Sequence, residues 1–259
     1  MRDRRDILIY FSLKYNGDWN NIYKALRSRE EVDWSIYESF PEELRKKCIT
    51  IFDEGIYPER LSKIYHPPFV LYYRGDISLI SDTNKNVALV GSREASEYGL
   101  DATRMVADAL SVKNILVSGM AIGIDSYAHR QVIESGGKTI GVLPCCISEC
   151  YPYSSRDIYK IMSKHHLIIS EYPFPFEIVP AKLPSRNRII VGISKAVIVP
   201  EVRERSGTLI TIDLALMNGI TVYCIPHPYN DGTINNHLIY EGAELIETKE
   251  EIIELLGNY

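Results

Sequence analysis

From Asn86 onward the chain repeats one pattern, in which a short run of apolar residues is followed by a longer segment of helical periodicity. The runs that we expect to be strands are residues 87–90, 115–117, 139–143, 167–169, 196–199 and 221–225. Runs that are apolar at every position are typical of parallel strands covered on both faces. The pattern therefore predicts an α/β fold with a doubly wound, mostly parallel, Rossmann-like sheet. In such sheets ligands bind beyond the carboxyl ends of the strands.

The first 60 residues follow a different pattern. Apolar residues recur at helical spacing between Ile7 and Tyr15, and Pro41 followed by two glutamates favours the start of a further helix. We therefore predict a small helical module over residues 1–60, SAM-like or helix-hairpin-helix-like. An extended α/β domain is expected over residues 61–259, ending in a short acidic helix.

The composition excludes several classes of protein. No apolar run approaches the about 20 residues that span a bilayer, and the charged start of the chain lacks a signal-peptide pattern. The five cysteines are odd in number and unevenly spaced, which favours free thiols in a reducing cytoplasm. Three of them, Cys145, Cys146 and Cys150, lie close together but lack a fourth ligand at the spacing of structural zinc. We expect a cytoplasmic protein without membrane contact, metal or cofactor.

Charge is unevenly distributed along this acidic chain, whose formal net charge is -5. Residues 181–210 contain six basic and two acidic side chains, a balance of +4, whereas residues 241–259 contain one basic and six acidic, a balance of −5. A local basic patch can bind phosphates on an acidic protein. The window 181–210 is therefore a candidate for contact with a polyanion.

Residues suited to phosphate follow the first two expected strands. Gly91, Ser92 and Arg93 combine a close backbone approach, a hydroxyl and a bidentate guanidinium. Gly119 and Gly123 echo a dinucleotide fingerprint, but the spacing differs and no acidic ribose partner follows about 20 residues later. A nicotinamide cofactor is therefore not expected, and helix packing or an anion-facing helix start fits these glycines better. The alternative at the first strand is a tight turn with a solvated arginine.

Two further segments lie at expected helix starts. Arg186, Asn187 and Arg188 would add charge to the positive end of a helix dipole. In a later segment the hydroxyls and the glycine could hold an anion or cap a helix; these residues are Ser206, Gly207 and Thr208. A capped helix with solvated charges is the alternative for the arginine segment. Glu201, just before the later segment, could act as a base, which keeps an enzyme reading open.

Taken together, these segments resemble the DprA/Smf family, the DNA-processing proteins of bacterial transformation. The matching segments, in chain order, are YPERL (57–61), HPP (66–68), RG (74–75), VGSR (90–93), YG (98–99), SGMAIGID (118–125), YP (151–152), SEYP (170–173), PSRNRII (184–190), Glu201, SGTLIT (206–211) and EGA (241–243). They span roughly residues 55–247, and an ordered set is far more specific than any one motif.

The resemblance implies a Rossmann-like core that binds single-stranded DNA, dimerises and helps to load the RecA recombinase, without catalysis. By position, Ser92 and Arg93 would contact phosphate. The residues implied to line or charge the DNA groove are Lys182, Arg186, Asn187 and Arg188, and the candidates for contact with a base are Phe174 and Phe176. From sequence alone, replacing Arg186 and Arg188 together by alanine is expected to abolish DNA binding and to leave the melting temperature nearly unchanged.

The chain departs from the family pattern in two places. Residues 143–148, LPCCIS, stand where relatives have a glycine-rich turn, so a close backbone approach is not expected there. The chain ends soon after the core, and the C-terminal winged-helix-like domain of many relatives is expected to be absent.

Two alternatives to DNA binding remain. Cytokinin-activating phosphoribohydrolases share the superfamily and would make the protein a nucleotide-binding or nucleotide-hydrolysing enzyme, but their paired glycines are missing between Pro200 and Thr208. The other alternative is a pure interaction module, in which the basic window meets an acidic partner, because charge alone does not exclude it.

Overall fold

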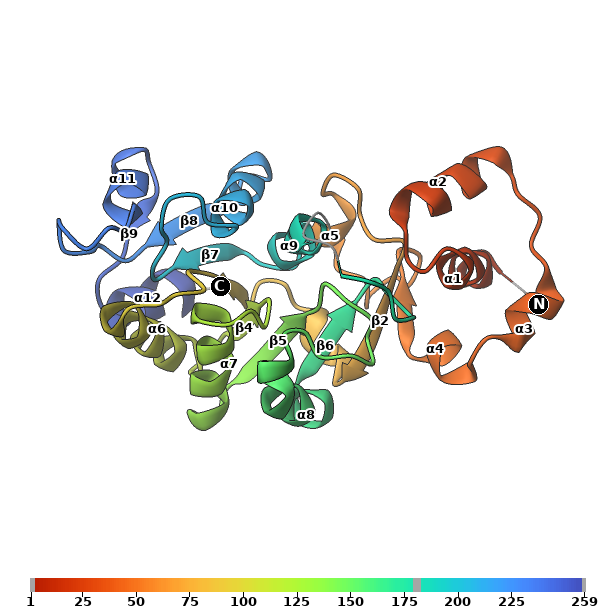
Figure 1. Cartoon of the computed structure of the whole chain (residues 1–259), viewed down its shortest axis with the longest axis horizontal. Coiled ribbons are helices and arrows are strands. Elements are labelled where there is room, and N and C mark those ends of the chain that lie inside the picture. The colour runs from red at the N-terminus through yellow and green to blue at the C-terminus, as the bar shows by residue number, and fades with distance from the viewer. Residues whose placement is uncertain (1–2, 179–182, 258–259) are drawn as a thin grey trace.

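One nine-stranded sheet runs through the computed structural model, which describes residues 3–178 and 183–257. The strand order is β1-β2-β6-β5-β4-β3-β7-β8-β9 (Figure 1). The strands are β1 (Cys48–Thr50), β2 (Val70–Gly75), β3 (Asn86–Leu89), β4 (Ile115–Ser118), β5 (Lys138–Val142), β6 (Leu167–Ser170), β7 (Ala196–Val199), β8 (Thr221–Cys224) and β9 (Glu244–Leu245). Each of the six apolar runs forms a strand, which confirms that part of the sequence prediction.

The strands in the run β6-β5-β4-β3-β7-β8-β9 pair in parallel with their neighbours. Strand β2 pairs antiparallel with both β6 and β1. Both faces of the parallel part are buried. Val87 and Leu89 of β3 pack into one hydrophobic cluster, whereas Ala88 of β3 and Val90 just after it pack into the cluster on the opposite face, as the two-residue period of a strand requires. The predicted doubly wound, mostly parallel architecture is therefore confirmed.

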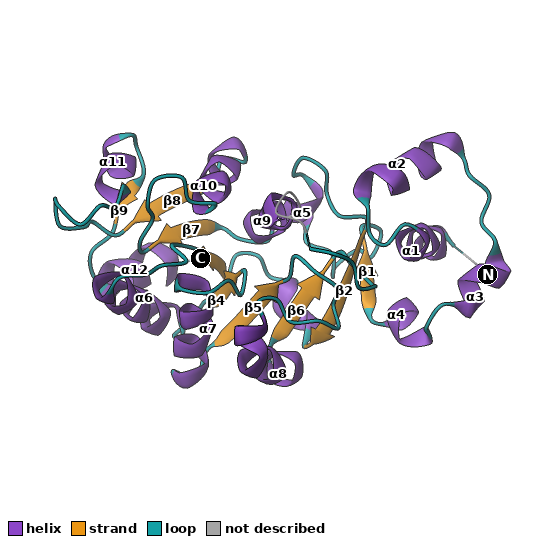
Figure 2. Ribbon diagram, viewed as in Figure 1, coloured by secondary structure: helices purple, strands orange, loops and turns teal. Residues whose placement is uncertain are grey.

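Helices cover each face of the sheet (Figure 2). One side carries α6 (Glu97–Leu110), α7 (Ile124–Glu134), α8 (Arg156–His165) and α12 (Lys249–Gly257), and the other carries α5 (Glu59–Ser62), α9 (Leu183–Gly192), α10 (Thr208–Met217) and α11 (Asn235–Tyr240). Two short 3-10 helices, η1 (Ile77–Ile80) and η2 (Tyr153–Ser155), complete this part. The acidic helix expected near the end of the chain is α12. None of the helices in the described ranges is long and apolar enough to cross a bilayer.

The N-terminal residues form α1 (Arg4–Lys14), α2 (Trp19–Ser28), α3 (Trp34–Ser39) and α4 (Glu42–Lys46). Asp3 accepts hydrogen bonds from the first-turn N–H groups of α1, and the Asp6 side chain completes a capping box. The segment predicted as a small helical module, residues 1–60, also contains β1, which extends the sheet beyond β2. A domain boundary at residue 60 stays a prediction.

The N-terminal helices pack directly on the sheet. Side chains of α1 from Leu8 to Leu13 share a buried cluster with Val70 and Tyr72 of β2, and the Tyr72 hydroxyl donates to Ser12 Oγ at 2.9 Å. Strand β1 and the helices before it therefore share a hydrophobic core with the rest of the sheet.

The loop after β5 turns inward. Cys145 and Cys146 are completely buried, and the backbone of Ile147 donates to the carbonyl of Tyr172 at 2.9 Å. All five cysteines are free thiols. Proline and thiols in place of a glycine-rich turn thus produce a loop whose side chains belong to the core.

Candidate nucleic-acid interface

A pocket of about 520 Å³ opens where the sheet order reverses, beyond the ends of β3, β4 and β7. Its walls are the loop after β3, the loop after β4, the first turns of α9 and the start of α10. This is the topological switch point at which doubly wound sheets bind ligands. We call it the strand-end pocket.

Most of the residues singled out from the sequence meet at this pocket. Those that line it are Gly91, Ser92, Arg93, Arg186, Asn187, Ser206, Gly207 and Thr208. Four others do not line it: Gly119, Arg188, Phe174 and Phe176. Lys182 lies outside the residues that the structure describes. DNA contact by any of these side chains stays a prediction.

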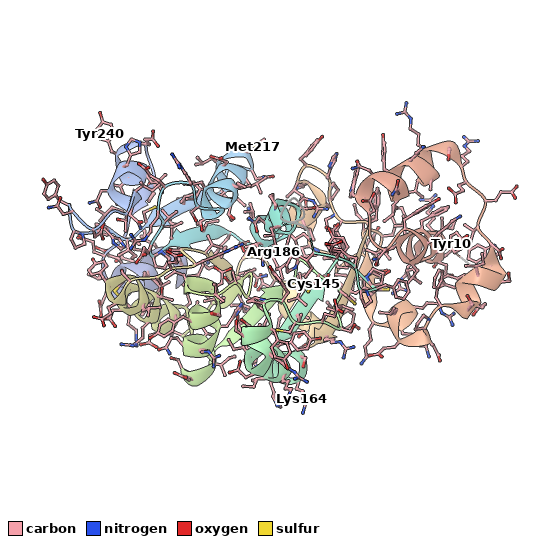
Figure 3. The ribbon with its side chains drawn as sticks, in the orientation of Figure 1. Tyr10, Cys145, Lys164, Arg186, Met217 and Tyr240 are labelled. Atoms are coloured by element: carbon pink, nitrogen blue, oxygen red, sulfur yellow. The ribbon has the colours of Figure 1, made fainter. Side chains whose placement is uncertain are left out.

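Arg186 is a buried pocket residue whose hydrogen bonds are already used. Its Nη1 donates to the carbonyl oxygens of Gly119 and of Val142, the latter at 2.7 Å, and its Nε donates to Asn187 Oδ1 at 3.0 Å. These bonds tie α9 to the ends of β4 and β5. Figure 3 labels Arg186 at the centre of the molecule, beside α9. The Arg186 side chain therefore stabilises the pocket by holding the segments at its base together.

The Arg186 guanidinium interacts electrostatically with the carboxylate of Asp125, in the first turn of α7. Burial raises the pKa of Asp125, while the Arg186 guanidinium and backbone N–H groups of Ala121, Gly91 and Gly119 act against that rise. Burial also lowers the pKa of Arg186, and the same carboxylate opposes that change. Each charge therefore partly compensates the burial of the other.

Arg188 is held away from the pocket by Glu171. Its Nη1 donates to Glu171 Oε2 at 2.8 Å and its Nη2 donates to Oε1 at 2.7 Å. The two side chains are only 10% and 6% exposed. Burial alone would lower the pKa of Arg188, but the Glu171 carboxylate outweighs it and raises that pKa. The ion pair links α9 to the end of β6. The Arg188 guanidinium is therefore engaged in a structural contact and is not free to bind a ligand.

The exposed arginines of the pocket lie at its rim. Arg93 and Arg205 are exposed and line the pocket, whereas Arg203 is partly exposed and its Nε lies 3.4 Å from Glu201 Oε1. Arg205 has a left-handed backbone, with φ 59. Sequence reasoning counted Arg203 and Arg205 in the basic window but did not assign them to the site; the charge window itself was the signal for them.

The hydroxyl segment at the start of α10 closes one wall. Ser206 Oγ accepts a hydrogen bond from the Thr208 N–H at 3.2 Å, and Thr208 Oγ1 donates to the Gly91 carbonyl at 2.9 Å. The backbone N–H of Ser92 donates to the Glu201 carbonyl at 2.8 Å. These bonds bring the loops after β3 and β7 together and place Ser92, Arg93 and the α10 start around one opening.

Glu201 is fully buried. Its Oε2 accepts hydrogen bonds from Ser96 N at 2.9 Å and Ser96 Oγ at 2.5 Å. It therefore positions the start of α6 and does not line the pocket. The two phenylalanines are also engaged, since Phe174 packs near Phe40 with ring centroids 6.0 Å apart and Phe176 packs near Tyr172 at 4.7 Å.

Metal chemistry has no support in the described part of the chain. Within residues 3–178 and 183–257, no group of three or more His, Cys, Asp or Glu side chains could hold a metal ion. The open pocket, its exposed guanidinium groups and its helix start are instead suited to an anion.

Comparisons with known proteins agree on one family. The family model described as DNA recombination-mediator protein A matches residues 47–257. The DNA processing protein DprA of Streptococcus pneumoniae is 36% identical over 219 residues, which cover 84% of this chain and 74% of that protein. DprA of Bacillus subtilis is 38% identical over 205 residues, 77% of this chain and 68% of that protein.

Solved structures give the same result. The X-ray structure of DprA from Streptococcus pneumoniae has a TM-score of 0.76 and 31% identity, covering 96% of this chain and 92% of that one. A Helicobacter pylori DprA structure, which addresses the single-stranded DNA binding mode of that protein, has a TM-score of 0.73 and 29% identity, covering 78% of this chain and 94% of that one. The sequence resemblance is confirmed, and this chain belongs to the DNA recombination-mediator protein A (DprA) family.

Proposed function

We propose that this protein binds single-stranded DNA in the strand-end pocket and acts as a recombination mediator. The observation that carries the proposal is the pocket rim, where Arg93, from the loop after β3, and Arg205, from the loop after β7, are exposed at one opening. Support also comes from the Helicobacter pylori relative, whose structure addresses the single-stranded DNA binding mode of that protein. Family membership supports the mediator role.

The pocket offers different groups to the two parts of a nucleotide. A phosphate would lie near Ser92 and Arg93 and near the start of α10, where the helix dipole adds positive potential. A base would face the apolar side of the opening, where Leu183, Ile190 and Ile210 lie. Arg186 and Asn187 form the floor between these regions. An extended flexible strand fits such a site better than a rigid duplex, because its bases are free to turn into the pocket.

We further infer that the DNA-bound protein passes the strand to the RecA recombinase during DNA uptake and that it works as a homodimer in the cytoplasm. Large apolar side chains support a protein–protein contact at one edge of the molecule. They are Leu216 and Met217 at the end of α10, Tyr240 at the end of α11 and Leu245 in β9. Figure 3 labels Met217 and Tyr240 at the outer ends of their helices, on the same edge.

An isologous contact between two copies fits this edge. Met217 is 80% and Tyr240 is 89% exposed, and exposed apolar groups that gather on one face are typical of interaction sites. Strand β9 is also the last strand of the sheet. Sedimentation velocity checks the inference: the wild type is expected to sediment as a dimer, and Met217→Glu with Tyr240→Glu as a monomer. A wild type that is monomeric at high concentration would contradict it.

An enzymatic role is not part of the proposal. Glu201, the candidate base, is buried and accepts two hydrogen bonds from Ser96. Incubation with nucleoside monophosphates is expected to release no base.

Binding to DNA is tested with single- and double-stranded oligonucleotides at two salt concentrations. The single strand is expected to bind more tightly, and its affinity is expected to fall steeply with salt because bound phosphates release counterions. Equal affinity for both forms, or an affinity that salt does not change, would contradict the proposed function.

A further inference from the structure

A second pocket lies beside the strand-end pocket and has no assigned role. Its volume is about 510 Å³, and its walls come from the loop after β5, from η2 and from the first turns of α8. Three of its side chains are tyrosines, Tyr151, Tyr153 and Tyr159, and two are cations, Arg156 and Lys160. We call it the tyrosine pocket.

Aromatic faces are available to a ligand there. Tyr153 is 72% and Tyr151 is 41% exposed. Arg156 lies over the Tyr153 ring, 5.3 Å from its centroid, and its Nη1 donates to the Tyr153 hydroxyl at 2.6 Å. Tyr159 is fixed by a hydrogen bond from its hydroxyl to the Ile147 carbonyl at 2.7 Å. A ring held by a guanidinium and open on its other face is preorganised for stacking.

The charge of the tyrosine pocket also favours an anionic ligand. Arg156 and Lys160 stand against one lining carboxylate, Glu149, so two positive groups face one negative group. Among the described residues no carboxylate lies within salt-bridge distance of Arg156 or Lys160, and Asp157, the acidic neighbour in α8, pairs with Arg130 at 2.7 Å. Aromatic faces combined with cations that have no carboxylate partner are the elements that bind single-stranded nucleic acid.

Two observations place the tyrosine pocket next to the strand-end pocket. Ser155, between Tyr153 and Arg156, donates from Oγ to the Met120 carbonyl at 3.1 Å, and the next residue, Ala121, lines the strand-end pocket. The loop after β5 lines the tyrosine pocket and the loop after β4 lines the strand-end pocket, and β4 and β5 are neighbouring parallel strands. We therefore expect a DNA strand that leaves the first pocket to reach the second within a few nucleotides.

We propose that the tyrosine pocket is a second subsite for the same DNA strand, with a base stacked on Tyr153 and a phosphate held by Arg156 and Lys160. This inference rests on the proposed function, because the strand must first occupy the strand-end pocket. The tyrosine pocket would extend the length of DNA that the protein binds. An oligonucleotide too short to reach this pocket would therefore gain no affinity from it.

The test compares oligothymidylates of about 5 and about 20 nucleotides by fluorescence anisotropy. The double variant Tyr153→Ala, Arg156→Ala is expected to bind the long strand about tenfold more weakly than the wild type, and to bind the short strand equally well. Its salt dependence on the long strand should also be shallower, because one phosphate contact is lost. Tyr153→Phe alone keeps the ring and loses only the hydrogen bond from Arg156, so it should bind the long strand much more tightly than the double variant.

A matched control pair exists on α6 and α7. Arg104 Nη2 donates to the Tyr127 hydroxyl at 2.7 Å, and the guanidinium lies 6.0 Å from the ring centroid. Neither residue lines a pocket described above. Tyr127→Ala with Arg104→Ala removes the same two side chains and the same charge, and it is expected to leave binding of both oligonucleotides unchanged.

The outcomes separate this inference from the proposed function. A wild type that binds neither oligonucleotide overturns the proposed function and this inference with it. A wild type that binds both, with a Tyr153–Arg156 variant that binds the long strand just as well, overturns this inference alone. Equal losses on the short and long strands would place the effect at the strand-end pocket, and would also overturn it.

Discussion

The guanidinium of Arg186 lies directly against Gly119, in the space that a side chain at residue 119 would fill. A Cβ built on Gly119 would overlap Nη1, Cζ and Nη2 of Arg186. The same guanidinium donates to the Gly119 carbonyl. The glycine after β4 is therefore required by a buried side chain of the protein, which explains why it is present without a dinucleotide fingerprint.

Gly119→Ala is consequently expected to lower the free energy of unfolding by about 2–4 kcal/mol, because the added methyl group displaces a buried charged side chain from its hydrogen bonds. Urea denaturation followed by circular dichroism measures the change. Gly207→Ala is the matched control, since Gly207 has φ -61 and nothing lies within 4 Å of its added Cβ. Equal stability of the two variants would contradict the role of Gly119.

The ion pair between Arg188 and Glu171 leads to a second prediction. Arg188→Met leaves a buried carboxylate without its partner, and about 3–5 kcal/mol of stability is expected to be lost. The double variant Arg188→Met, Glu171→Leu removes both charges and should recover most of that loss. A double-mutant cycle in urea measures the coupling. Simple additivity of the two single losses would show that the pair does not act as a unit.

These partners change the expected result of replacing both arginines of α9. Sequence reasoning expected Arg186→Ala with Arg188→Ala to remove DNA binding at unchanged stability. Because both side chains are buried and hydrogen-bonded, the double variant is now expected to unfold at a clearly lower temperature. Differential scanning calorimetry distinguishes the two expectations, and an unchanged melting temperature would favour the first.

The exposed rim supplies a cleaner test of DNA contact. Arg93→Ala with Arg205→Ala removes two exposed pocket charges and is expected to weaken binding of single-stranded DNA at least about tenfold, with the logarithmic salt slope reduced by about 1.4. Stability should change by less than about 0.5 kcal/mol, as for most surface substitutions. Arg27→Ala in α2 with Arg29→Ala at the C-cap of that helix removes the same charge elsewhere. Equal binding by the two double variants would argue against the rim.

The sequence alone was sufficient to predict the parallel strands of the core, but it was insufficient to predict the strand β1 at the edge of the sheet. Runs such as residues 196–199 are apolar at every position, so their burial on two faces can be read locally. Strand β1 is only three residues long, Cys48–Thr50, and follows a charged helix. Its strand conformation depends on pairing with β2, which is not encoded in any short window.

The candidate site shows the same division. Charge and position identified Arg186 and Arg188, but their burial depends on Glu171 and on carbonyl groups of β4 and β5, which lie far away in the chain. The exposure of Arg205 likewise follows from how the loop after β7 turns. Residue type was therefore enough to locate the pocket. The tertiary structure was needed to tell which arginines are buried and hydrogen-bonded and which are exposed.

Buried thiols give a prediction about reactivity. Burial raises the pKa of Cys48, Cys145 and Cys224 to about 12 and that of Cys150 to about 11. Since the thiolate is the nucleophile, these groups should react very slowly with a disulfide reagent at pH 8 in the native protein. Cys150, which is partly exposed, is expected to react first as the pH rises. Rapid release of one chromophore per thiol at pH 8 would contradict this ordering.

The last prediction concerns acid stability and His129. This side chain is completely buried in α7, with Nδ1 2.6 Å from Thr139 Oγ1. Burial, aided by His166 and Arg186, lowers the pKa of His129 to about 3. The unfolded chain, with a histidine pKa of about 6.5, therefore binds one more proton than the native state between these values. The stability that the neutral ring contributes is present above about pH 6.5 and is lost as the pH falls below it, by about 1.4 kcal/mol per pH unit. Urea titrations at pH 4.5 and 6 should show this slope reduced by about one proton in His129→Gln. The same slope in the His129 variant and the wild type would show that His129 titrates normally in the folded protein.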